Sequence, residues 1–192
     1  MALPFSIAQA AYCGELEPVV GWLQKGGHVD ALDENGLGLL HVAVSDRQLR
    51  VVKELLQRGA SVDLRGPEAS TPIMMAAELS DHAMVRLLLE HRASIDLQSA
   101  SHGRTALMTA VHKSHTECVQ ELLAAGASTE LRDVDGRTAL VAAEMQGHAA
   151  MAELLRQHAA KPTATAATPT LTLTEEIGRA AYHGELQQVV EW

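Results

Sequence analysis

Residues 71–93 read TPIMMAAELSDHAMVRLLLEHRA, and residues 105–127 read TALMTAVHKSHTECVQELLAAGA. Both stretches begin with threonine, continue through an apolar segment to a pair of leucines, and end in alanine. The pattern recurs along the chain with a unit of 33 residues, and a less regular copy occupies residues 1–32. A fixed period of this length is typical of a stacked solenoid, in which each unit contacts its neighbours and the stack presents a long surface.

Each unit contains signals for two helices followed by a turn. Thr71 is a good N-cap, and Pro72 takes the first helical position, where its missing N–H has no helical partner to lose. The apolar residues that follow recur with helical spacing in both predicted helices. Turns such as Asp33–Gly36 and Asp133–Gly136 begin with aspartate and end with glycine, which suits a hairpin-like turn.

A glycine column marks the end of each second helix. Gly59 and Gly126 occupy it, which predicts a C-terminal cap with positive φ. Arg92 and Ala159 stand in the same column. Because a residue with a side chain is strained at positive φ, we expect both positions to be weak points of the array.

These columns resemble the ankyrin repeat, whose signature G-x-T-P-L-H-x-A-A is followed by G-x-x-x-x-V-x-x-L-L-x-x-G-A. The resemblance is carried by Thr71-Pro72-Ile73, Gly103-Arg104-Thr105-Ala106-Leu107 and Gly136-Arg137-Thr138-Ala139-Leu140, while only His41 keeps the histidine. It implies an all-α fold: an ankyrin-repeat α-solenoid of stacked helix-turn-helix units with projecting β-hairpin-like turns. Five repeats are expected in the array over residues 1–162, at about 1–32, 33–65, 66–99, 100–132 and 133–162.

The C-terminal part of the chain has a different character. Residues 163–174 are rich in Thr, Ala and Pro and are predicted to be a linker. Residues 177–192 then restate residues 7–22, with ten of sixteen positions identical. We therefore expect residues 175–192 to be an incomplete sixth repeat that begins a duplicated array, and the sequence to be a fragment of a longer protein.

Composition and charge limit the classes of partner. The chain is 47% hydrophobic with a net charge of −9, which disfavours nucleic acid because phosphates require a basic surface. No apolar run reaches the roughly 18 residues of a membrane helix. Cys13 and Cys118 lie far apart in the repeats, which favours free thiols and a reducing compartment. We expect a monomeric, intracellular and cytoplasmic protein that is not inserted in a membrane.

The histidines and cysteines that could act in catalysis or metal binding have structural explanations. The spacing of His112 and His115 could place both on one helix face, but no carboxylate partner or H-E-x-x-H pattern accompanies them. His41 is expected to tie neighbouring loops together, since a buried ring needs hydrogen-bond partners. Cys118 is expected to be buried and inert, and Cys13 accessible. No nucleophile motif, phosphate loop, metal site or cofactor site is predicted, so the chain is not expected to be an enzyme.

In the ankyrin family, the exposed positions of the first helices and the turn tips form a concave face that commonly binds proteins. The resemblance implies that the same positions bind a protein partner here. We refer to them as the concave face; its predicted residues are Tyr12, Glu34, Asn35, Leu37, Asp46, Glu68, Glu78, Leu79, His102, Arg104, His112, Lys113, Asp135, Arg137 and Met145.

Charge is distributed unevenly along these positions. The second and third repeats contribute carboxylates and the fourth contributes cations, which predicts a partner carrying opposite charges in opposite order. The favoured function is a non-catalytic scaffold or adaptor. The alternative is an N-terminal targeting fragment of a larger multidomain enzyme or regulator, whose effector domain lies beyond Trp192.

Overall fold

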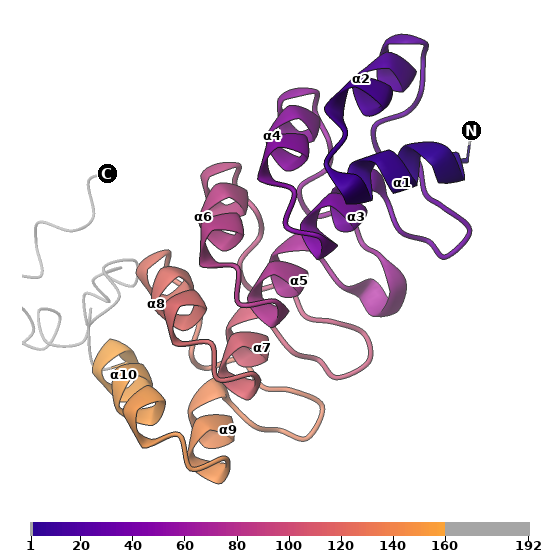
Figure 1. Ribbon diagram of the computed structural model, residues 1–192. Helices are drawn as coiled ribbons and strands as arrows, with labels where there is room; N and C mark the ends of the chain where they lie inside the picture. The colour runs from indigo at the N-terminus through magenta and orange to yellow at the C-terminus, as the bar shows by residue number, and fades with distance from the viewer. Residues whose placement is uncertain (1, 160–192) are drawn as a thin grey trace, which may run out of the picture. The chain divides into compact units, whose positions relative to one another are not determined.

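Ten α-helices follow one another as five pairs in the part of the chain that the computed structural model describes, residues 2–159 (Figure 1). Within this part, a single bridge between Leu32 and Gly38 is the one element of β structure. The predicted all-α solenoid of stacked helix pairs is confirmed. The predicted linker at 163–174 and the predicted sixth repeat at 175–192 lie outside the described residues, as do residues 160–162.

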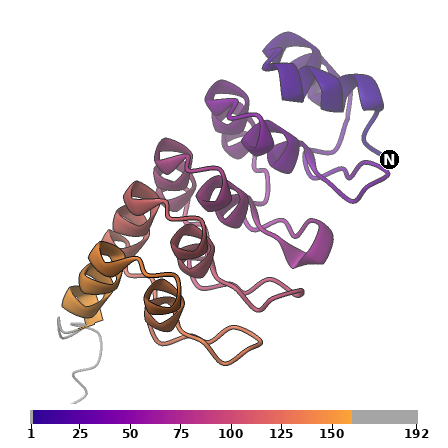
Figure 2. The same cartoon turned by 60° about the horizontal axis from the view of Figure 1, so that its bottom comes forward.

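The helices form two parallel rows. One row holds the first helices α1 (Phe5–Cys13), α3 (Leu39–Ser45), α5 (Pro72–Glu78), α7 (Ala106–His112) and α9 (Ala139–Met145). The other holds the second helices α2 (Leu16–Gln24), α4 (Leu49–Gln57), α6 (His82–Glu90), α8 (Thr116–Ala124) and α10 (Ala149–Ala159). The long connections between pairs project beyond the first-helix row, away from the second helices, and one of them contains the short 3-10 helix η1 (Pro67–Ala69) (Figure 2).

Small side chains bring the first helices close to one another. An alanine recurs at the same position of every first helix, and each one is buried: Ala10, Ala43, Ala76, Ala110 and Ala143. The second helices contribute larger aliphatic side chains, among them Leu55, Leu88 and Leu122, which are completely buried. The core is therefore continuous along the stack, and each pair buries its apolar faces against its neighbours.

The threonines at the starts of the first helices do not all behave alike. Thr105 and Thr138 accept hydrogen bonds from the backbone N–H of Met108, at 3.2 Å, and of Val141, at 3.3 Å. Thr71 occupies the N-cap position as predicted, but its hydroxyl makes no capping bond and is buried without a partner. The predicted side-chain cap at Thr71 is therefore wrong.

The proline that follows accounts for the difference at Thr71. All three N-cap residues are extended, and contact with a following proline ring shifts the residue before it toward φ of about −120°. Thr71 has φ −108°, whereas Thr105 and Thr138 both have φ −82°. Pro72 thus supplies a preorganised first turn, while Thr71 loses the geometry of the side-chain cap.

The glycine column at the ends of the second helices has the predicted left-handed backbone. Gly59 and Gly126 have φ of 84° and 90°, and Arg92 has φ of 64° in the same column. The prediction that Arg92 is held at positive φ is confirmed. The prediction for Ala159 is wrong, because α10 continues through Ala159 and the residue ends a helix two residues longer than α8.

Hydrogen bonds connect successive repeats at the ends of the second helices. The carboxylates of Asp30, Asp63 and Asp96 accept from backbone N–H groups one repeat further on, each at 2.9 Å; the donors are Ser61, Ser94 and Ser128. This ladder recurs with the period of the sequence and holds neighbouring turns in register.

His41 connects two repeats from inside the core, as predicted. Its ring is fully buried, with Nδ1 accepting from Gly38 N–H and Nε2 lying 3.4 Å from the carbonyl oxygen of Ser70. Burial lowers the pKa of His41 below its usual value, and the hydrogen bond to Ser70 opposes the shift without cancelling it. The neutral ring is therefore the form that the fold stabilises.

Candidate functional site

The concave face joins the first helices to the turn tips. Its turns are rigid where aspartate begins them: the Oδ1 atom of Asp33 accepts from the N–H groups of Asn35 and Leu37, both at 2.8 Å. Asp133 makes the equivalent bonds to Asp135, at 3.0 Å, and Arg137, at 2.9 Å. The side chains at these tips are therefore presented from a fixed backbone.

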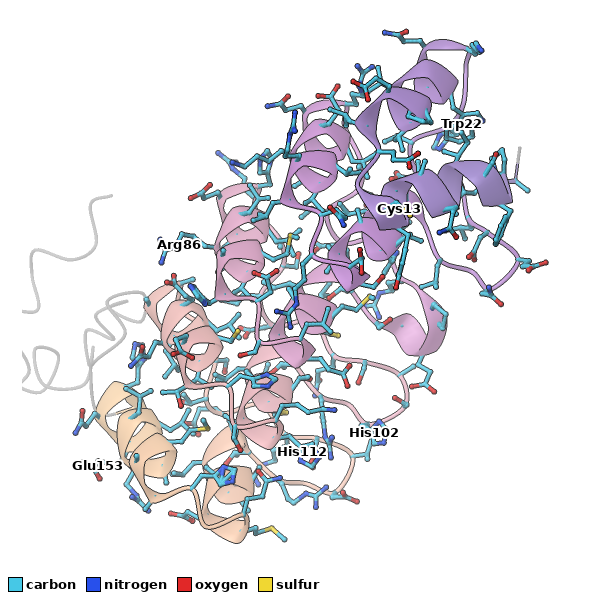
Figure 3. All side chains as sticks on the ribbon, in the orientation of Figure 1. Cys13, Trp22, Arg86, His102, His112 and Glu153 are labelled. Carbon is cyan, nitrogen blue, oxygen red and sulfur yellow. The ribbon has the colours of Figure 1, made fainter. Side chains whose placement is uncertain are left out.

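The predicted residues of this face differ in exposure. Ten of them are exposed: Tyr12, Glu34, Asn35, Glu68, Glu78, His102, His112, Lys113, Asp135 and Met145. The other five are half-buried: Leu37, Asp46, Leu79, Arg104 and Arg137. Figure 3 shows His102 and His112 on the side of the turns, whereas Arg86 and Glu153, on second helices, lie on the opposite side of the stack.

Hollows lie along this face between the helices and the turns. One, of about 610 Å³, is lined by Phe5 and Tyr12 of α1 and by the tip residues Glu34 and Asn35. A second, of about 290 Å³, is lined by residues of two turns and of α5 and α7, including Glu68, Glu78, His102, Arg104, His112 and Lys113. A third, of about 180 Å³, is lined among others by Arg104, His112, Arg137 and Met145.

The structure thus brings most of the predicted residues together in three groups. Leu37, Asp46, Leu79 and Asp135 line none of these hollows. Leu79 contributes its carbonyl oxygen to a hydrogen bond from Arg47, at 2.5 Å, and Asp46 accepts from Gln48 at 2.8 Å. Leu79 and Asp46 therefore support the helix–helix turns as well as adjoining the face.

The charges of the face are partly compensated within it. Lys113 Nζ lies 2.9 Å from Glu78 Oε1, which joins the acidic third repeat to the basic fourth. The guanidinium of Arg137 pairs with Asp133 at 3.1 Å and also with Asp135. Within residues 2–159, the guanidinium of Arg104 has no such carboxylate partner. The predicted change from acidic to basic is thus blunted where the two repeats meet.

The pKa of His112 is affected by the positive charges around it. Its Nδ1 atom accepts a hydrogen bond from the side-chain amide of Gln146 at 2.7 Å. Partial burial lowers the pKa of His112, and the nearby charges of Arg104, Lys113 and Arg137 lower it further. The neutral form of the ring is therefore favoured, and the ring lies in a positive field that favours anionic groups.

Burial at Asp133 by itself would raise the pKa of its carboxyl group. The hydrogen bonds from the backbone and guanidinium of Arg137 outweigh burial and hold that pKa below its usual value. The carboxylate is thus kept charged inside its own turn, where it fixes the turn geometry and pairs with Arg137.

Two exposed apolar side chains add to this surface and are absent from the predicted set. Phe5 is 80% exposed on α1 and Val134 is 66% exposed at a turn tip. Phe5 occupies the column that holds Thr71, Thr105 and Thr138 in later repeats. An aromatic residue in a polar column is a signal that could have identified it.

The other histidines and cysteines considered for catalysis or metal binding include residues with structural roles. His115 Nδ1 lies 2.9 Å from the carbonyl oxygen of Ala77, so this ring ties α8 to the preceding repeat. Cys118 is buried, and that burial raises the pKa of its thiol to about 11, whereas Cys13 is exposed, as predicted. Within residues 2–159, no three His, Cys, Asp or Glu side chains are arranged to hold a metal ion.

None of the helices in the described part combines the length and the apolarity that a membrane crossing requires.

No curated protein matches the sequence. The family model described as ankyrin repeats (3 copies) matches residues 7–99 and 94–166, a span that runs from within α1 to beyond the end of α10. Repeats of this kind are generally protein–protein interaction modules. The chain, with its period, its stacked pairs and this match, belongs to the ankyrin repeat family.

Proposed function

We propose that this chain is a non-catalytic interaction module, a scaffold or adaptor, that binds a protein partner along the concave face. The observation that carries the proposal is the position of the hollows: those of about 610, 290 and 180 Å³ all lie between the first helices and the turns. Binding sites on proteins are concave and mix apolar surface with a few polar groups.

Anchoring side chains are present along the same face. Met145 is 68% exposed and Tyr12 is 48% exposed, and each lines a hollow. Large exposed apolar side chains in a partly enclosed surface supply most of the affinity of an interface, because contact with a partner removes them from water. Methionine adapts its shape to different partners more readily than branched residues do.

Charge would then set the orientation of the partner. Arg104 faces two hollows and has no carboxylate partner within the described residues, whereas Lys113 is already paired with Glu78. We therefore expect the substitution Arg104→Ala to slow association more than Lys113→Ala does. Charges at the edge of an interface act mainly on the association rate and its dependence on salt.

Photo-crosslinking tests the proposal directly. A photoreactive amino acid would replace Glu68 or Met145 on the concave face, or, as controls, the exposed residues Gln57 and Glu153 on second helices. We expect adducts to a protein partner from the first two positions and none from the controls in extract of the source cells. Adducts confined to Gln57 and Glu153, or none at any position, would refute the proposed binding face.

A further inference from the structure

We propose that the hollow beside α1, which we call the α1 hollow, binds a protein segment that carries aliphatic side chains next to lysine or arginine. The inference rests on the proposed interaction function and specifies the chemistry of the partner at one end of the concave face. The α1 hollow, at about 610 Å³, exceeds the other two hollows described above, of about 290 and 180 Å³, and it has one apolar wall and one acidic wall.

The apolar wall is one side of α1. Phe5, Ala8 and Tyr12 are spaced by three, four and seven residues, which places them along a single helix face. Phe5 and Tyr12 leave 80% and 48% of their surfaces exposed, and both line the hollow. Aromatic faces bind aliphatic chains and also attract ammonium and guanidinium groups held above the ring.

The acidic wall is the first turn. Asp33 receives N–H bonds from Asn35 and Leu37 at 2.8 Å, and its own N–H donates to the Leu37 carbonyl oxygen at 2.8 Å. The neighbouring Glu34 projects from this fixed backbone and is exposed beside the hollow. A carboxylate held by a rigid turn loses little conformational freedom when it pairs with a cation.

The N-terminal segment holds the two walls together. The N–H of Leu3 donates to the carbonyl oxygen of Leu32 at 2.9 Å, and the Leu3 side chain is buried beneath the hollow. This bond fixes the start of α1 against the strand-like residue that precedes the turn. The separation of the aromatic and acidic walls is therefore built into the fold.

The charge around this end of the array selects a cationic partner. Residues 1–46 contain one lysine against six aspartates and glutamates, a net charge of −5, whereas residues 47–159 contain twelve basic and fourteen acidic residues, a net charge of −2. More than half of the total charge of −9 is thus concentrated at the end that contains the α1 hollow. An acidic segment or an anionic lipid surface would be repelled there.

Peptide binding to the complete chain tests the inference. Fluorescence anisotropy would compare short dye-labelled peptides of alternating leucine and lysine, alternating leucine and glutamate, and alternating serine and lysine. We expect only the leucine–lysine peptide to bind with a saturable curve. Because aromatic contact and charge both contribute, replacing either its leucines or its lysines should weaken binding by about tenfold or more.

Matched variants locate the binding site. Glu34→Lys should weaken the leucine–lysine peptide at least about threefold, because it replaces attraction by repulsion. Glu17→Lys is the control, since it makes the same charge change on α2 of the preceding repeat, and it should alter affinity less than about twofold. Tyr12→Ala should weaken binding about fivefold, while Tyr12→Phe keeps the ring and most of the affinity. Circular dichroism checks that each variant is folded.

The outcomes separate this inference from the proposed function. Equal effects of Glu34→Lys and Glu17→Lys, or binding of the leucine–glutamate peptide, would overturn the assignment of the α1 hollow. A concentration-dependent dimer that Tyr12→Ala abolishes would overturn it in favour of a second copy of the chain. Crosslinks from Met145 together with no peptide binding would overturn this inference alone, whereas the absence of crosslinks from both Glu68 and Met145 would overturn the proposed function.

Discussion

Replacing Arg92 by glycine should stabilise the array. Arg92 has φ of 64° at the end of α6, in the column where Gly59 and Gly126 have φ of 84° and 90°. Its side chain is exposed and forms no ion pair within the described residues. The substitution Arg92→Gly therefore removes backbone strain and gives up no ion pair.

The expected gain is the difference between two effects. A left-handed backbone costs a residue with a side chain about 1–2 kcal/mol, which glycine does not incur. Glycine also has more freedom in the unfolded chain, which offsets about 0.4–1 kcal/mol of that gain. The free energy of unfolding should rise by about 0.5–1 kcal/mol, equivalent to a rise in Tm of about 1–4 °C for an array of this size.

Urea and thermal unfolding of Arg92→Gly and of the reverse variant Gly126→Arg would measure this. Gly126 is a suitable control because a Cβ atom there would meet no other atom within 4 Å. Backbone strain at positive φ is therefore the main effect of adding a side chain at this position. We expect Gly126→Arg to lower the free energy of unfolding by about 1 kcal/mol. Unchanged midpoints in both variants would refute the argument that positive φ strains this column.

Two further predictions concern buried polar groups. Thr71→Val should leave stability unchanged or raise it by up to about 1 kcal/mol, because the buried hydroxyl has no partner, whereas Thr105→Val should lose about 1 kcal/mol with its N-cap bond. Paired urea titrations compare them, and equal losses would contradict the difference in capping. The lowered pKa of His41 predicts that stability falls as pH drops below about 6.5, because the unfolded ring takes up a proton more readily than the buried one. The test is to measure the free energy of unfolding between pH 7 and 5 for the chain and for His41→Met, a substitution that introduces the residue found at the same position of α5 and α7. The free energy of unfolding should fall less steeply with decreasing pH in the variant. Equal slopes would assign the pH dependence to other groups.

The helix pairs and the positions on the concave face were predictable because they depend on local periodicity. The glycine column at Gly59 and Gly126 predicted the left-handed backbone at Arg92, since the same turn geometry recurs in each repeat. The lack of a cap at Thr71 was not predicted. There, Pro72 acts on the preceding residue, and this local effect overrides the pattern that Thr105 follows.

Side-chain pairing on the concave face could not be derived from the periodicity. The ion pair between Lys113 and Glu78 joins residues of different repeats, and its formation depends on how closely α5 and α7 pack. Phe5 was overlooked because it stands where later repeats have threonine. Only the folded first turn shows that Phe5, Tyr12 and Glu34 line one hollow.

The period of the sequence was enough to predict the family, the order of the helices and the positions that are exposed on the first helices and turns. This is because each repeat is stabilised by its nearest neighbours, so every unit has the same spacing of core residues. Only the folded chain shows which charges are compensated, which hydroxyl has no partner within residues 2–159 and where hollows form along the face. These properties depend on contacts between repeats, and the distance between two side chains in different repeats is set by packing rather than by their separation along the chain.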